Sequence, residues 1–225
     1  MNNPLLKLSQ RIGYTFKDES LLKLALTHRS KGGLNNERLE FLGDSIVNFV
    51  AAEALFHKFP DAKEGKLSRL RAGLVRGTTL AELGRDFDLG EFLVLGSGEL
   101  KSGGFNRESI LADAVEAIIG AIFLDSDFNE VKKHVLNWYG DRITSLKVDD
   151  IVKDSKTRLQ EYMQKAQNRL PKYDVIEVFG QAHDQKFKVA CHIENLPEVT
   201  IGIGSSRRLA EQSAAEKALK ALGAE

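Results

Sequence analysis

The stretch NERLEFLGDS, residues 36–45, spaces three acidic side chains so that they could act together. Glu37, Glu40 and Asp44 lie three and four residues apart, so a helix would place their carboxylates on one face. Like charges at these spacings repel each other and destabilise a helix by about 0.2–0.5 kcal/mol per pair. Such a stripe is either an ordinary solvated helix face or a set of ligands for a cation.

A second acidic stripe occurs in SILADAVEAIIGAIFLD, residues 109–125, which is apolar on almost every other side. Only Asp113, Glu116 and Gly120 interrupt the apolar surface, again three and four residues apart. A helix that is apolar all round is normally buried, and burying an unpaired carboxylate costs free energy. The segment contains no Lys or Arg to balance these charges, so the pattern favours a functional pair over a solvated face.

If the two stripes face each other, several carboxylates meet in one cleft, and Gly120 leaves room for a close approach. With oxygen ligands and no His or Cys nearby, the cations that fit best are Mg²⁺ and Mn²⁺. Mg²⁺ held by a few carboxylates keeps coordination positions for water and for a substrate phosphate. The residues therefore predict metal-dependent phosphodiester hydrolysis.

The segments that must position these acids show apolar residues at helical spacing up to about residue 147. Glycine- and asparagine-rich stretches, KGGLNN and GSGELKSGGFN, interrupt them as predicted loops. The side of the first acidic helix opposite the carboxylates carries Leu39, Leu42, Ile46 and Phe49. We expect helices over residues 4–12, 19–27, 37–57, 64–73, 77–86, 108–124 and 127–146.

Beyond residue 154 the pattern predicts a helix, three strands and a second helix. Asp154 or Ser155 is the expected N-cap of the first helix. The polar stretch KVDDIVKDSK separates this pattern from the preceding helices. The predicted fold is multidomain, α and α+β: an all-helical domain at 1–147, a linker at 148–154, and an α-β-β-β-α domain at 155–225, with elements at 155–167, 173–180, 186–193, 199–204 and 206–222.

The composition is that of a globular chain: 42% of the 225 residues are hydrophobic, and 32 basic residues balance 32 acidic ones. The neutral total is only weak evidence against RNA binding, because the placement of charges matters more than their sum. A single cysteine, Cys191, excludes an internal disulfide, which suits a reducing compartment. No segment has the pattern of a signal peptide or a membrane span, so we expect a cytoplasmic protein with no membrane partner.

Both acidic motifs resemble those of a known family. NERLEFLGDS resembles the signature of ribonuclease III, an endonuclease that cleaves double-stranded RNA, and ESILADAVEAIIGAIFLD resembles that family's second acidic motif. The resemblance continues through KTRLQEYMQ and GSSRRLAEQSAAEKAL, so it covers nearly the whole chain. It implies a helical nuclease domain followed by a double-stranded RNA-binding domain, and a homodimer with one metal site in each subunit.

The resemblance also assigns roles to the acidic residues. Asp44 and Glu116 match the two positions most critical for chemistry, with Mg²⁺ as the cofactor and Mn²⁺ able to substitute. Glu37 and Glu64 match accessory acidic positions that line the cleft. The implied metal-binding carboxylates are Glu40, Asp44, Asp113 and Glu116.

Phe41 lies beside the acidic stripe, which is an unusual place for a large apolar ring. One interpretation is a locally buried core residue. The resemblance favours the other, in which Phe41 belongs to the dimer interface and packs into a pocket on a second subunit.

In the second domain the resemblance implies three RNA-binding regions, which recognise A-form shape with little sequence preference. The first helix could meet 2′-hydroxyls, and the loop after the first strand could enter a minor groove. The start of the last helix combines basic side chains with the helix dipole, which favours phosphate. Glu211 stands where many such domains carry a basic residue, and this would weaken the phosphate contact. The expected RNA-binding residues are Gln160, Glu161, Gln164, His183, Ser205, Ser206, Arg207 and Arg208.

Other residues that could do chemistry have simpler interpretations. His28, His57 and His134 could be general acids, but structural histidines explain them more simply. Lys101 or Arg107 could touch RNA phosphates, with a solvated loop as the alternative.

The resemblance implies that the chain is an endoribonuclease that cleaves precursors of ribosomal and other structured RNAs, leaving 5′-phosphate and 3′-hydroxyl ends with short 3′ overhangs. One rival is a double-stranded RNA-binding protein in which the nuclease fold is only a scaffold, but such a protein has no use for mutually repelling acids. The other rival is a metal-dependent phosphohydrolase that acts on small nucleotides. The C-terminal α-β-β-β-α module makes this interpretation less favoured.

Overall fold

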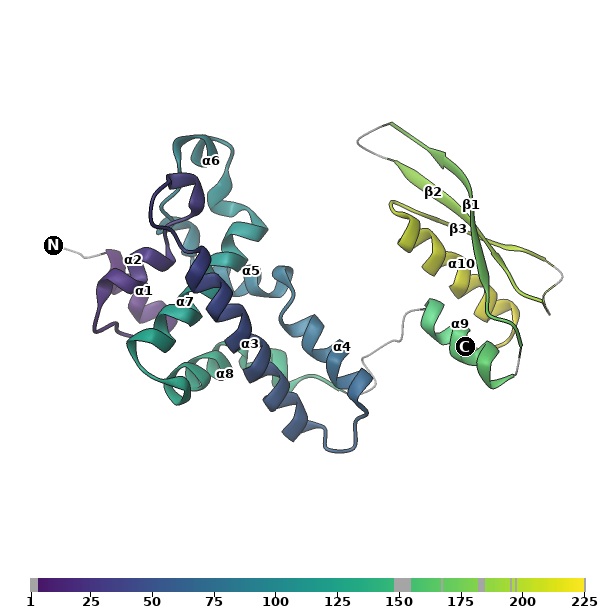
Figure 1. Cartoon of the computed structure of the whole chain (residues 1–225), viewed down its shortest axis with the longest axis horizontal. Helices are drawn as coiled ribbons and strands as arrows, with labels where there is room; N and C mark the ends of the chain where they lie inside the picture. The colour runs from purple at the N-terminus through teal and green to yellow at the C-terminus, as the bar shows by residue number, and fades with distance from the viewer. Residues whose placement is uncertain are drawn as a thin grey trace. The chain divides into compact units, whose positions relative to one another are not determined.

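The computed structural model describes residues 4–147, 155–166, 168–181, 185–194, 196 and 198–224 (Figure 1). The chain divides into two compact units, Met1–Ile151 and Val152–Glu225. The predicted linker at 148–154 lies outside the described residues. Each unit has a hydrophobic core of its own.

The described part of the first unit is helical. Between the acidic motifs, where the sequence predicted a glycine-rich loop, the chain instead forms the short helix α6 and a 3-10 turn at Gly104–Asn106. Two further 3-10 turns lie at Arg29–Lys31 and Leu89–Glu91. The helices are α1 (Pro4–Ile12), α2 (Glu19–Ala25), α3 (Glu37–Lys58), α4 (Glu64–Leu74), α5 (Gly77–Asp86), α6 (Ser97–Lys101), α7 (Glu108–Asp125) and α8 (Phe128–Thr144).

Helix α7 lies at the centre of this unit, with α2, α3, α5 and α8 packed against it (Figure 1). Its apolar residues are buried almost throughout, as its composition predicted. Two glycines let α3 and α7 touch through their backbones. A Cβ on Gly43 would lie 1.7 Å from the carbonyl oxygen of Glu116, and a Cβ on Gly120 would lie 2.3 Å from that of Leu39. Glycine is therefore required on both helices for this approach.

The apolar residues of α3 do not all face the core. Leu39 and Ile46 are buried, whereas Phe49 is 57% exposed. Phe49 lies seven residues from both Leu42 and Phe56, so these three side chains follow one flank of the helix. Leu42 is partly buried against the core, but the exposure of Phe49 and Phe56 shows that the core does not cover the rest of this flank.

The second unit has the predicted α-β-β-β-α order. Helices α9 (Ser155–Lys165) and α10 (Arg207–Ala221) pack with an antiparallel sheet of order β1-β2-β3. The strands are β1 (Lys172–Phe179), β2 (Lys186–His192) and β3 (Thr200–Gly204). Ser155 is the first residue of α9 rather than its cap, and Asp154 lies outside the described residues.

Small residues bring α10 close to the sheet. A Cβ on Gly202 of β3 would lie 2.1 Å from the carbonyl oxygen of Ala210 and 2.3 Å from the backbone nitrogen of Ala214. Gly202 pairs with Val189, a fully buried residue of the central strand β2. The alanines of α10 therefore form its packing face, as the sequence predicted.

Candidate active site and RNA-binding surface

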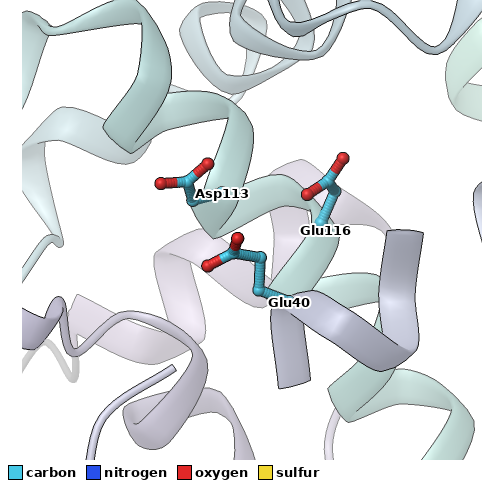
Figure 2. A group of neighbouring side chains, drawn as sticks. All are labelled: Glu40, Asp113 and Glu116. Atoms are coloured by element: carbon cyan, nitrogen blue, oxygen red, sulfur yellow. The ribbon is translucent and has the colours of Figure 1, made fainter. Parts of the chain in front are cut away.

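Three carboxylates from α3 and α7 meet in one place. Glu40, Asp113 and Glu116 each present an oxygen, and these oxygens all lie within 4.8 Å of one another. Figure 2 shows Asp113 and Glu116 projecting from α7 and Glu40 from α3 toward the same space. The close backbone contact at Gly43 and Gly120 explains why side chains from two helices come this near.

Asn36 fixes the start of α3 and hence the position of Glu40. It is 2% exposed, and its side-chain amide donates to the carbonyl of Ala25 at 3.2 Å. Its backbone N–H donates to Thr27 at 2.9 Å, and its carbonyl accepts from the N–H of Glu40 at 2.9 Å. The first turn of α3 is thus anchored to the end of α2. Sequence reasoning missed Asn36, because an asparagine before a helix usually reads as an exposed cap.

Burial raises the pKa of all three carboxylates, and neighbouring acids raise it further for Glu40 and Glu116. Burial, with Asp44 as the strongest neighbouring charge, raises the pKa of Glu116 to about 8. Burial also raises the pKa of Asp113 and that of Glu40, although the charge of Arg29 acts in the opposite direction on both. A group of acids that holds protons this tightly gains stability from a bound cation. The donor set is entirely carboxylate oxygen, which fits a hard divalent metal ion.

Asp44 stands beside this group rather than within it. It is exposed, and its Oδ1 accepts a hydrogen bond from the side-chain amide of Asn48 at 2.8 Å. Asp44 still lies close enough for its charge to raise the pKa of Glu116. Its role as a metal ligand stays a prediction.

The two accessory acids are not members of the three-carboxylate group, although the charge of Glu37 raises the pKa of Glu40. Glu37 pairs with Arg29 at 3.7 Å on the surface. Glu64 is the first residue of α4 and accepts a hydrogen bond from Ser68 at 2.6 Å. It lines a separate pocket of about 600 Å³ together with Phe49 and Phe56. The described chain alone therefore does not bring Glu64 to the acidic site.

Of the three histidines considered above as general acids, two have structural partners. His28 is buried and accepts the backbone N–H of Ser30 at 3.2 Å through Nδ1. His134 is buried, with Nε2 3.0 Å from the carboxylate of Glu130. His57 is exposed, and its ring lies 5.5 Å from that of Phe56.

The two cations near the glycine-rich stretch differ in their surroundings. Arg107 pairs with Glu99 at 2.7 Å, so its charge is balanced within the protein. Lys101 ends helix α6 and is exposed. Neither observation places RNA at this stretch.

The predicted RNA-binding residues of the second unit lie on the surface where they are described. Gln160 and Gln164 are exposed on α9, and Glu161 is partly exposed. His183 lies outside the described residues. At the other region, Ser206 caps α10 by accepting the N–H of Leu209 at 3.2 Å. Ser205, Arg207 and Arg208 are exposed around this helix start.

A helical unit with a half-buried acidic cluster, followed by an α-β-β-β-α unit, defines a nuclease joined to a nucleic-acid-binding module. Residues 18–143 match the Ribonuclease-III-like family model, and residues 155–222 match the double-stranded RNA binding motif. The chain belongs to the ribonuclease III family, so the predictions of family and two-part fold are confirmed. It is a double-stranded RNA endoribonuclease. Enzymes of this family depend on a metal ion, and the acidic cluster of this chain could bind one.

Relatives support the assignment to the ribonuclease III family over nearly the full length of the chain. The chain is 62% identical to Ribonuclease 3 of Marinomonas sp. (strain MWYL1), covering 96% of this chain and 95% of the relative. It is 61% identical to Ribonuclease 3 of Hahella chejuensis (strain KCTC 2396), covering 99% of both.

Solved structures agree with the fold. The nuclease domain of ribonuclease III from Campylobacter jejuni matches with a TM-score of 0.61 and 44% identity, covering 65% of this chain and all of that one (100%). Dicer from Pichia stipitis matches with a TM-score of 0.50 and 29% identity, and the match covers 91% of this chain and 94% of that one. Among the helices described, none has the length and apolar character needed to cross a membrane.

Proposed function

We propose that this chain hydrolyses phosphodiester bonds of double-stranded RNA at a Mg²⁺ site formed by Glu40, Asp44, Asp113 and Glu116. The supporting observation is the convergence of three carboxylates within 4.8 Å, at raised pKa. When bound, the divalent ion supplies a Lewis acid that lowers the pKa of water and stabilises the leaving oxygen. The products are 5′-phosphate and 3′-hydroxyl ends with short 3′ overhangs, from precursors of ribosomal and other structured RNAs.

The side chains of the site have distinct tasks in this proposal. Glu40 and Asp113 hold the cation from opposite helices, so the distance between α3 and α7 sets the size of the site. Glu116 is the most strongly perturbed acid, and its raised pKa keeps its carboxylate mostly protonated at neutral pH until a cation balances its neighbours. Asp44 is exposed and oriented by Asn48, which keeps its carboxylate at the substrate side of the group.

We also propose that the protein acts as a homodimer through α3. Phe41 is 77% exposed and follows Glu40 directly in the sequence. The pocket lined by Phe49, Phe56 and Leu67 is apolar and large enough, at about 600 Å³, for an aromatic ring. In a two-fold dimer the same contact occurs twice, with each Phe41 in the pocket of the other copy. The region involved in dimer formation is also the subject of a Campylobacter jejuni nuclease-domain structure.

This arrangement gives Glu64 a place in the chemistry. Glu64 lines the pocket that would receive Phe41, and Phe41 adjoins Glu40. Docking would therefore bring Glu64 of one copy toward the acidic site of the other, although Glu64 is not part of that site within its own copy. Two such sites related by two-fold symmetry would each cut one strand of a duplex.

One assay separates this proposal from its rivals. The purified chain is incubated with double-stranded RNA of random sequence, with double-stranded DNA, and with single nucleotides, in Mg²⁺ or in chelator. We expect cleavage of the RNA duplex only, and only with the metal. Binding without cleavage would support the scaffold alternative, and hydrolysis of nucleotides alone would support a phosphohydrolase.

A further inference from the structure

Glu211 lies where the two helices of the second unit meet. It is 8% exposed on α10, although glutamate is almost never buried unless it is paired. Its carboxylate accepts a hydrogen bond from the ammonium of Lys156 on α9 at 2.5 Å and another from Nε of Arg207 at 2.9 Å. One carboxylate thus holds two cations from two helices. These bonds lower the pKa of Glu211, although burial acts to raise it.

The bond to Arg207 restricts the orientation of its guanidinium. This group is planar and presents its donors as a rigid fork. A hydrogen bond at Nε therefore restricts the orientation of the plane and leaves its end-on edge, formed by the two Nη groups, directed away from Glu211. The Arg207 side chain stays 63% exposed. An oriented and accessible fork suits bidentate contact with a phosphate.

The bond to Lys156 ties α9 to the same place. The Lys156 ammonium lies 4.6 Å from the centroid of the Tyr173 ring, and its backbone N–H donates to Gln212 of α10 at 3.0 Å. The start of α9 is therefore joined to α10 at two points. Glu211 belongs to the connection between the two helices that carry the proposed RNA contacts.

The expectation from sequence was that Glu211 weakens phosphate binding, because it places an acid where a base is common. In the structure that acid is bonded to two bases, so the group of three carries one net positive charge. Its repulsion of a phosphate is offset within the protein. We propose that Glu211 is a positioning residue for double-stranded RNA binding, which acts by orienting Arg207. The inference rests on the proposed role of Arg207 as a phosphate ligand.

The two interpretations of Glu211 predict opposite signs for one substitution. Glu211→Gln in the full chain should weaken binding of a short RNA duplex in chelator by about tenfold, the worth of one charge-assisted hydrogen bond. Removing a merely repulsive acid should instead tighten binding. The matched control is Glu216→Gln, which removes an exposed acid from the same helix and should change affinity by less than about twofold. Equal or tighter binding by Glu211→Gln would overturn the proposal.

A double-mutant cycle separates positioning from a general structural effect. In the Arg207→Ala background, Glu211→Gln should change binding by less than about twofold, because the side chain that it positions is gone. An equal loss in both backgrounds would overturn the proposal. If Arg207→Ala alone leaves binding unchanged, the phosphate role of Arg207 is wrong, and the failure then lies in the proposed function.

A second variant keeps the test valid if Glu211→Gln fails to fold, as judged by circular dichroism. Arg207→Lys retains both Glu211 and the positive charge but lacks the planar fork. We expect it to bind the duplex about threefold more weakly, with an unchanged dependence on salt. Wild-type affinity for Arg207→Lys would show that orientation is not needed and would overturn the proposal.

Discussion

Replacing Glu116 with Gln tests whether the acidic site is built for a cation at the expense of stability. The substitution keeps the size of the side chain and removes its charge. Cleavage should fall by about two to three orders of magnitude, the usual effect of removing one group that stabilises transition-state charge. Binding of double-stranded RNA in chelator should be unchanged, because the proposed RNA contacts lie in the other unit.

The magnitude of the stability effect follows from the pKa of Glu116. Burial and neighbouring carboxylates raise this pKa from 4.5 to about 8. At about 1.4 kcal/mol for each tenfold change in proton affinity, the difference corresponds to at most about 5 kcal/mol. Glu116 remains partly exposed, so solvent screening should reduce this contribution to the free energy of unfolding to about 2 kcal/mol.

The sign of the effect sets its pH dependence. The folded state holds the Glu116 proton more tightly than the unfolded state, so this contribution is fully present below pH 4.5 and is lost as pH rises through about 8. Metal-free wild-type protein should therefore lose stability over this range. The Gln variant has no such proton to lose. Its nuclease unit should melt about 4–8 °C higher than that of the wild type near pH 8.5, with little difference near pH 5.

Thermal unfolding in chelator at several pH values measures this difference. Glu108→Gln is the matched control, because it places the same substitution on an exposed residue of the same helix. Added Mn²⁺ should raise the melting temperature of the wild type and have less effect on the Gln variant. Parallel melting curves for wild type and Glu116→Gln across the pH range would refute the reasoning, as would a variant that still cleaves.

Three further predictions test the helix crossing, the dimer and the RNA contacts. Gly43→Ala should destabilise the nuclease unit by about 3 kcal/mol or more, because its Cβ would overlap the backbone of α7, whereas Gly65→Ala on α4 meets open space and should not. Phe41→Ala should weaken the dimer in sedimentation by about 3–5 kcal/mol for each of its two Phe41 contacts, and a wild-type monomer at micromolar concentration would contradict the proposed interface. Replacing Arg207 and Arg208 with Ala should weaken binding equally for unrelated duplexes and flatten its salt dependence by about one unit per lost contact. Single-turnover cleavage at saturating RNA should then change little, and a large loss would show that these residues also take part in the chemistry.

The sequence predicted that acids from two helices come together, because the signal for this arrangement is local. Glu40, Asp113 and Glu116 are spaced by single helical turns on two segments, and the apolar surround of the second segment indicates burial. Gly120 indicated the close approach of α3 and α7, because it lies on the same stripe of α7 as Asp113 and Glu116. Helical periodicity also located the main helices, since each buries an apolar face.

Other features depend on contacts between distant segments and leave no such pattern. Asn36 is buried because the end of α2 covers it, which its own neighbourhood does not reveal. Phe49 was placed with the apolar side of α3, yet it is exposed, because the core covers only part of that side. The pairing of Glu211 with Lys156 joins residues 55 positions apart, so no local pattern indicates that this acid is neutralised.

The separate cores of the two units have a consequence for how the enzyme can change over generations. Within the described part of the chain, the nuclease core and the core of the second unit share no residue. Substitutions that alter affinity for RNA can therefore accumulate around α9 and α10 without disturbing the packing that holds α3 against α7. Selection can adjust where the enzyme binds while the chemistry of cutting stays constant. A chain of this design can acquire new targets by altering or exchanging one module.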